Sequence, residues 1–220
     1  MKYLVFSIDD GTVFDKRSIE IFNRYGVHAT FNLNSGLDDF VWFFNDEIPI
    51  RRLILKDNVH LYDGHEVASH ALTHPYLDSC SEEEIIRQVN EDILNLENIF
   101  HRKITSFATP FRTSGDRETN IIKNNCPVNN IRISCIDESM DTPTDLFNIK
   151  ITALDINRAF ELLPAFVERK EGVFIYAGHS YDFEVKTSFE RLEEFVQEVL
   201  KHDDIKIVTM SELVDIIKKS

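Results

Sequence analysis

Two adjacent carboxylates, Asp9 and Asp10, follow a short apolar run near the start of the 220-residue chain. Neighbouring side chains on an extended strand point to opposite faces, so one carboxylate could bind a metal ion while the other faces a water molecule. Gly11 then permits a sharp exit into the next loop. The alternative interpretation of the same residues is an acidic turn with no catalytic or binding role.

Two histidines, His70 and His74, are four residues apart after another apolar run. On a turn of helix this spacing places both imidazoles on one face, as a divalent metal ion requires. With one strand-end carboxylate they make a two-histidine, one-aspartate set that leaves positions for water and substrate. We place His65 outside this set, because a fourth protein ligand would close the open site.

A further histidine, His179, ends the apolar segment that begins at Gly172. A histidine after a strand can transfer a proton near neutral pH, although a histidine held only by structural hydrogen bonds is the alternative. The string Asp-Asp-Gly-Thr at residues 9–12 also suggests phosphatases that form an aspartyl phosphate. Ile8 stands where their nucleophile would be, so that interpretation lacks its attacking group.

The elements that must position these residues alternate along the chain. Short β-rich apolar runs predict strands at residues 3–8, 27–33, 66–69, 104–108, 130–135, 147–154, 172–177 and 205–210. Helical periodicity is clearest at residues 82–100, 157–169, 188–202 and 211–219, with Ser81 and Glu84 at capping-box spacing and Ser211 starting the last helix. Parallel strands need crossovers that helices supply, so we expect an α/β barrel, with a doubly wound open sheet as the alternative. In both folds the chemistry lies at the carboxyl ends of the strands.

These strand-end segments resemble, in the same order, the motifs of the polysaccharide deacetylase family (carbohydrate esterase family four, the NodB-homology domain). Residues 7–11 match its Thr-Phe-Asp-Asp-Gly motif, and His70 and His74 match its His-Ser/Thr-x-x-His motif. Residues 108–111 meet the third motif, Arg-x-Pro-Tyr, only in part. Residues 177–179 correspond to the fifth, an apolar residue, a spacer and a histidine. The resemblance covers nearly the whole chain.

The resemblance implies a single-domain, distorted (β/α)7 barrel over residues 1–220 that removes acetyl groups from an acetylated glycan or a small acetylated sugar. It implies one divalent metal ion, zinc by family expectation, although a His2Asp set also accepts cobalt, nickel or iron. The roles that it implies are Asp9 as general base, His179 as general acid, the backbone N–H of Phe111 as an oxyanion donor, Asp10, His70 and His74 as metal ligands, and Pro110, Arg112 and Tyr181 as substrate contacts.

The chain departs from the family pattern at two motifs. The third-motif arginine, which pairs with the catalytic aspartate, is Ala108 here, and Arg112 or Arg132 could replace it. The fourth motif, an aspartate near a tryptophan that orients the acidic histidine, is not evident; Asp137, Asp141 and Asp182 are the candidates. Aromatic side chains near the strand ends could stack on sugar rings or only anchor loops; they are Trp42, Phe43 and Phe44 in the insertion at 34–63, and Tyr181 and Phe183.

These departures leave two other functions open. A catalytically silent glycan-binding barrel would explain the missing third-motif arginine. A metal-dependent amidase acting on a non-carbohydrate C–N bond would explain why no export signal is evident.

Composition narrows the classes of partner. Thirty-eight acidic against 24 basic residues give a formal charge of −14, which excludes a general nucleic-acid binder and disfavours anionic membrane surfaces. No run reaches the roughly 18 apolar residues of a membrane span. No signal peptide is evident, so we expect a cytoplasmic protein, although a chain trimmed of its leader would look the same. The three cysteines, Cys80, Cys126 and Cys135, are expected to be free buried thiols.

Overall fold

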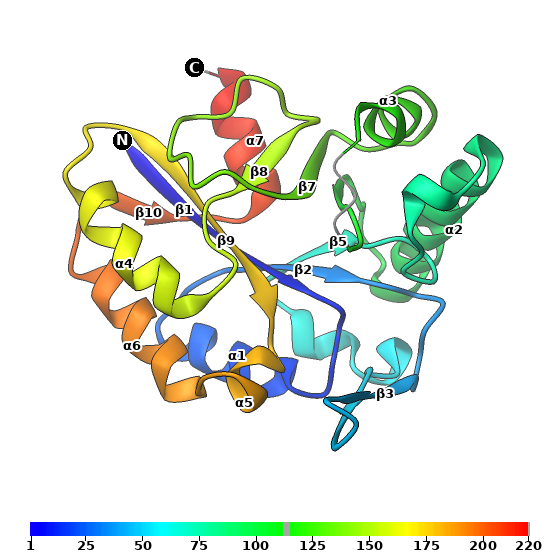
Figure 1. The fold of residues 1–220 in the computed structure, drawn as a ribbon, viewed down its shortest axis with the longest axis horizontal. Coiled ribbons are helices and arrows are strands. Elements are labelled where there is room, and N and C mark those ends of the chain that lie inside the picture. The colour runs from blue at the N-terminus through cyan, green and yellow to red at the C-terminus, as the bar shows by residue number, and fades with distance from the viewer. Residues whose placement is uncertain (112–114, 220) are drawn as a thin grey trace.

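A curled sheet of parallel strands forms the centre of the molecule, with helices around its outside (Figure 1). The computed structural model describes residues 1–111 and 115–219. The eight strands of this sheet are β1 (Lys2–Asp9), β2 (Thr30–Leu33), β5 (Glu66–Ser69), β6 (Ser106–Ala108), β7 (Asn130–Ile136), β8 (Ile149–Ile151), β9 (Gly172–His179) and β10 (Ile205–Ile207). Each strand overlaps one of the eight segments expected from the sequence, and every pairing between them is parallel.

Strand β1 is the axis of the sheet. One of its edges pairs with β9 along its whole length, from Lys2 to Asp9. Its other edge pairs first with β10 and then with β2. From β2 the sheet continues through β5, β6 and β7 to β8.

The sheet curls until its two ends meet beside β9. A bridge joins Ala153 to Tyr176, and Ala153 N–H donates to Ile175 O at 3.1 Å. These few contacts between β9 and the segment that follows β8 close a distorted barrel whose wall is formed by β1, β2 and β5–β9. Strand β10 pairs with the first half of β1. The single-domain (β/α)7 barrel is therefore confirmed, and the open doubly wound sheet is not adopted.

The helices cover the outer face of the sheet (Figure 1). They are α1 (Asp15–Arg24), α2 (Glu82–Phe100), α3 (Asp116–Asn125), α4 (Ile156–Val167), α5 (Asp182–Val185), α6 (Phe189–Leu200) and α7 (Met210–Lys219). Three short 3-10 turns are η1 (Leu55–Asp57), η2 (Val59–Tyr62) and η3 (Leu77–Ser79). No helix among the described residues is long and apolar enough to span a membrane.

Capping explains where two of these helices begin. The Ser81 hydroxyl accepts a hydrogen bond from Glu84 N at 3.2 Å, which confirms the cap expected for α2. The start expected for α7 was two residues too late. Thr209, not Ser211, is its cap, because Thr209 Oγ1 accepts from Glu212 N and Glu212 Oε2 accepts from Thr209 N at 2.8 Å.

The insertion at 34–63 has structure of its own. It carries an antiparallel hairpin of β3 (Val41–Phe44) and β4 (Ile48–Arg51), although none of the strands expected from the sequence lies in this segment. The hairpin is joined to the loop after β1, because Val13 N–H donates to Arg51 O and Leu53 N–H donates to Gly11 O, both at 2.9 Å. The insertion is thereby held beside the carboxyl end of β1.

Aromatic packing around β1 fixes the barrel against the helices. The ring of Phe6 contacts Phe22 of α1, Tyr176 of β9 and Phe195 of α6, with centroids 5.0, 5.8 and 6.1 Å away. Side chains on both faces of β1 are buried, as expected of a parallel strand covered on both sides. The three cysteines are free, but each is only partly buried, so the expectation of buried thiols was wrong in that respect.

Candidate active site and metal centre

The two aspartates of the first motif diverge at the end of β1. Asp9 is the last residue of the strand, and Asp10 leaves it with a φ of 85° while its N–H donates to Asn32 O at 3.0 Å. Asparagine and aspartate tolerate this left-handed region better than most residues. Both side chains are nearly buried, with 6% and 5% of Asp9 and Asp10 exposed. The change of backbone direction sends the two carboxylates to different partners.

His70 and His74 lie in the loop that follows β5. The expectation that they share a turn of helix was wrong, because Ala71 and His74 have φ values of 65° and 52° and the segment is not helical. Asn34 holds the loop by donating from Nδ2 to His70 O and Ala71 O. The loop still brings the two rings together, with centroids 4.8 Å apart.

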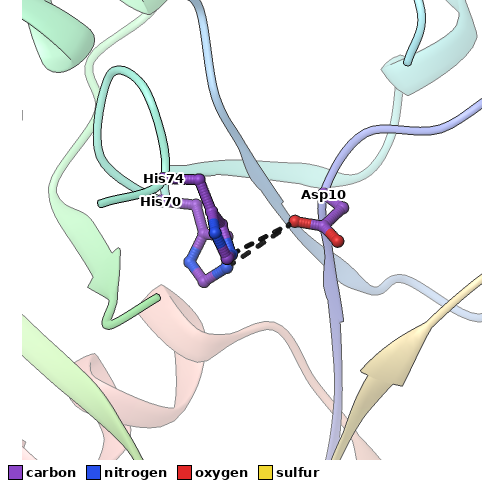
Figure 2. A group of neighbouring side chains, drawn as sticks. All are labelled: Asp10, His70 and His74. Carbon is purple, nitrogen blue, oxygen red and sulfur yellow. Dashed lines mark ion pairs between the residues drawn. The ribbon is translucent and has the colours of Figure 1, made fainter. Parts of the chain in front are cut away.

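Asp10, His70 and His74 converge as a candidate metal centre (Figure 2). Asp10 Oδ1 lies 3.5 Å from His74 Nε2 and 4.0 Å from His70 Nε2. Tetrahedral ligands about 2 Å from a zinc ion are separated by about 3.3 Å, so the set is close to the spacing that a metal requires. Three ligand atoms from two segments, the end of β1 and the loop after β5, therefore lie close together.

The protonation states of the histidines also fit a cation. His70 Nδ1 is 2.8 Å from Ala108 O and donates to it, which leaves the Nε2 lone pair toward Asp10. Burial lowers the pKa of His70 and lowers that of His74 to about 3, so both are neutral ligands at pH 7. His65 is outside the set, as expected, because its ring nitrogens contact Ala29 N and Asn23 Oδ1 instead.

Asp9 is held by an arginine from another strand. Arg132 Nη2, on β7, donates to Asp9 Oδ1 at 2.6 Å and to Oδ2 at 2.8 Å, and Asn32 Nδ2 donates to Oδ1 at 2.7 Å. Arg132 is only 2% exposed. Of the two arginines considered in place of the third-motif residue, Arg132 thus contacts Asp9, whereas Arg112 lies outside the described residues.

His179 ends β9 and faces the same centre. Its Nε2 is 3.7 Å from Asp10 Oδ2, and its Nδ1 is 2.9 Å from Asp182 Oδ2. Burial by itself would lower the pKa of His179, but the hydrogen bond to Asp182 and the charges of Asp10 and Asp9 outweigh it and raise the pKa. Of the three aspartates considered as its partner, Asp182 makes the contact. The other two pair elsewhere, Asp137 with Lys150 and Asp141 with Arg169.

Sequence reasoning did not identify Arg52, which follows β4. Its Nη2 donates to Asp10 Oδ1 at 2.9 Å, and its Nη1 donates to Asn34 Oδ1 at 2.5 Å and to the Asp10 carbonyl. Burial alone would raise the pKa of Asp10, but Arg52 and the three neighbouring histidines together lower it. No signal in the sequence marks Arg52, since it lies within the insertion and 42 residues from its partner.

A cavity of about 890 Å³ opens over these groups and has two aromatic walls. On one side Trp42 packs against Tyr181 at 5.6 Å, and Tyr181 stacks on the His179 ring at 4.6 Å. On the other side Phe111 packs against the His74 ring at 4.3 Å. A cavity of this size and character suits a small molecule with apolar faces.

The remaining expected contacts divide between the cavity and the core. Phe111 and Tyr181 line the cavity, whereas Pro110 is buried and is not among its lining residues. Trp42 also lines the cavity, but Phe43, Phe44 and Phe183 do not. Phe183 instead packs in the core beside Phe189, so it anchors α5.

Comparison with known proteins places the chain in a family. The model of the polysaccharide deacetylase family matches residues 1–126, more than half of the chain. The chain therefore belongs to the polysaccharide deacetylase family, whose members generally use a divalent metal ion. No curated protein sequence matches it significantly.

Solved structures of the same fold include enzymes and an inactive relative. The Xyl-CE4 domain of a multidomain xylanase from the hindgut metagenome of Trinervitermes trinervoides superposes with a TM-score of 0.66 at 19% identity, over 99% of this chain and 91% of that one. Peptidoglycan deacetylase PdaC from Bacillus subtilis has a TM-score of 0.63 at 16% identity, over 99% and 92%. A CE4 family pseudoenzyme from Bacillus anthracis has a TM-score of 0.63 at 19% identity, over 97% and 65%. At these identities the likeness supports the barrel fold alone.

Proposed function

We propose that this protein is a metal-dependent hydrolase that removes acetyl groups from N-acetylated or O-acetylated carbohydrate. The observation that carries the proposal is the convergence of Asp10, His70 and His74 beside a separate carboxylate, Asp9, that an arginine holds in place. A divalent ion, which we propose to be zinc, would polarise the acetyl carbonyl and lower the pKa of water at this site.

Asp9 is assigned as the general base. Its Oδ1 accepts hydrogen bonds from both Arg132 and Asn32, whereas Oδ2 accepts one from Arg132 alone and lies 3.9 Å from His70 Nε2, on the side of the metal ligands. We therefore assign proton abstraction from the attacking water to Oδ2. The water oxygen bonds to the acetyl carbon, and the carbonyl oxygen gains negative charge, for which we propose the backbone N–H of Phe111 as a hydrogen-bond donor.

His179 is assigned as the general acid. Asp182 Oδ2 accepts a hydrogen bond from Nδ1–H of His179. Nε2 is therefore the nitrogen that faces the centre, and we assign it the transferable proton. When the bond between the acetyl carbon and the sugar nitrogen or oxygen breaks, the leaving atom takes that proton. The raised pKa of His179 favours the protonated form that this step needs.

The cavity supports a carbohydrate as substrate. Sugar rings have apolar faces that stack on aromatic side chains, and Trp42 and Tyr181 offer such a wall beside His179. We propose an acetylated glycan or a small acetylated sugar, with Tyr181 as a substrate contact.

Acetate release from zinc-loaded protein tests the function. The acetylated substrates are N-acetylglucosamine, chitin oligomers and acetylated xylan. Small cyclic amides serve as non-carbohydrate substrates, and their hydrolysis is followed by ring opening because it releases no acetate. We expect acetate from at least one carbohydrate, and a loss of roughly 10²-fold to 10⁴-fold in Asp9→Asn at unchanged zinc content.

Other outcomes contradict the proposal. Turnover confined to the cyclic amides would identify a different hydrolase. Zinc binding without turnover of any substrate would favour a silent barrel, a state that the Bacillus anthracis relative shows to be compatible with this fold.

A further inference from the structure

Arg52 and the two histidines share one oxygen of Asp10. Arg52 Nη2 donates to Oδ1 at 2.9 Å, and the same Oδ1 is the oxygen that lies 3.5 Å from His74 Nε2 and 4.0 Å from His70 Nε2. The pair is shielded from water, since Arg52 and Asp10 are 6% and 5% exposed. A cation bound by the histidines would therefore share its carboxylate oxygen with a guanidinium.

We propose that Arg52 is a positioning residue that orients Asp10 and, through its charge, makes the metal centre bind its ion more weakly than the Asp-His-His set would alone. The inference rests on the proposed function, because it concerns the same metal centre. It adds a residue that the family motifs matched in the sequence do not contain.

The charge effect outweighs the loss of orientation for a structural reason. The backbone of Asp10 is also held by the hydrogen bond from its own N–H to Asn32 O, so its orientation does not depend on Arg52 alone. The repulsion between the Arg52 guanidinium and a divalent ion bound to the same oxygen would not be offset by that backbone hydrogen bond. In a buried site this repulsion is screened far less than at the surface.

The position of Arg52 links the metal centre to the wall of the cavity. Arg52 continues the hairpin of β3 and β4, and its guanidinium carbon lies 5.2 Å from the ring of Trp42. Trp42 is the one tryptophan of the chain. Its fluorescence therefore reports on Arg52 directly, without a substrate.

The test is a zinc titration of the metal-free protein against a chromophoric chelator, with Trp42 fluorescence recorded in parallel. We expect Arg52→Gln and Arg52→Met, which remove the charge, to lower the zinc Kd by roughly tenfold or more. Arg52→Lys keeps the charge, so its Kd should lie closer to wild type than to either neutral variant. Circular dichroism confirms that each variant is folded.

A neighbouring arginine provides the matched control. Arg51 lies on the same hairpin but is exposed and pairs with Asp39, so Arg51→Gln makes the same change of charge away from Asp10. It should leave the zinc Kd unchanged. The fluorescence change on zinc binding should occur in wild type and Arg51→Gln and be altered in Arg52→Gln.

The outcomes separate this inference from the proposed function. Zinc binding that is unchanged or weaker in both neutral variants overturns the inference and leaves the metal centre standing. An equal gain in affinity in Arg51→Gln also overturns it, because the effect would then be one of net charge. If wild-type protein binds no zinc, both the inference and the proposed metal centre fail.

Discussion

Arg132 Nη2 lies 2.6 and 2.8 Å from the two carboxylate oxygens of Asp9, although the residues are 123 positions apart in the chain. The third motif of the family, where the partner of this aspartate would be sought, has Ala108 instead. The guanidinium that the third motif lacks is thus provided by Arg132 on β7. We therefore propose that Arg132 orients Asp9, the proposed general base.

Removing this guanidinium should affect activity and stability together. In Arg132→Met, Asp9 loses its partner in a buried site, so we expect kcat/KM to fall by roughly 100-fold and the free energy of unfolding by about 3–5 kcal/mol. Arg132→Lys should recover part of both. Acetate release and urea unfolding measure the two effects, with zinc content as the control. Full activity in Arg132→Met would show that Asp9 does not need this partner.

The contact between His179 and Asp182 predicts a change in the pH profile. Asp182 raises the pKa of His179, so Asp182→Asn should lower that pKa. A general acid acts only when protonated, and the alkaline limb of kcat/KM should therefore move to lower pH, with a loss of roughly 10²-fold at pH 8.

Lys186 provides the control for this experiment. It pairs at 2.6 Å with the other oxygen of Asp182, Oδ1, and is half exposed. Lys186→Met should leave the profile close to wild type. An unchanged alkaline limb in Asp182→Asn, or an equal shift in Lys186→Met, would remove Asp182 from the role that we assign to it.

Asp15, which the proposed mechanism does not use, should also make stability depend on pH. It is fully buried in the first turn of α1, where Tyr62 donates to its Oδ2 at 2.9 Å, and burial raises its pKa from 3.8 to about 7. The folded state thus holds a proton that the unfolded state releases above pH 3.8. The stabilisation is complete below that pH and is lost as the pH rises through 7.

The matched variant is Asp15→Asn, which stays neutral. Relative to this variant, wild-type protein should lose about 2 kcal/mol of unfolding free energy between pH 5.5 and pH 8. Chemical denaturation at the two pH values measures the difference. A constant difference between the two proteins would show that Asp15 does not titrate in this range.

The sequence predicted those features that depend on local pattern and on the rule that parallel strands end at one edge. Asp9, Asp10, His70 and His179 meet because each lies at the carboxyl end of a strand of the same parallel sheet, as its last residue or directly after it. The pairing of His70 and His74 was predicted from the wrong local structure. The two histidines are nevertheless paired, because a loop with two residues in the left-handed region brings together side chains that are four positions apart in the sequence, as a helical turn would.

The residues that sequence reasoning left open or did not find depend on tertiary contacts. Arg132 was one of two candidates until the barrel placed β7 opposite the end of β1. Arg52 had no local signal, because its partner is reached only when the hairpin folds beside Gly11. Likewise α1 was not singled out, since its buried stripe, including Ile19 and Phe22, is short and lies among charged residues.

The zinc content of the purified, zinc-reconstituted protein tests the central claim most directly, because it needs no choice of substrate. We predict about one zinc per chain in wild type. His74→Ala and Asp10→Asn should lose it, while His60→Ala, which changes an exposed histidine paired with Asp63, should keep it. Absence of zinc from wild-type protein, or its retention in both ligand variants, would contradict a metal centre at Asp10, His70 and His74.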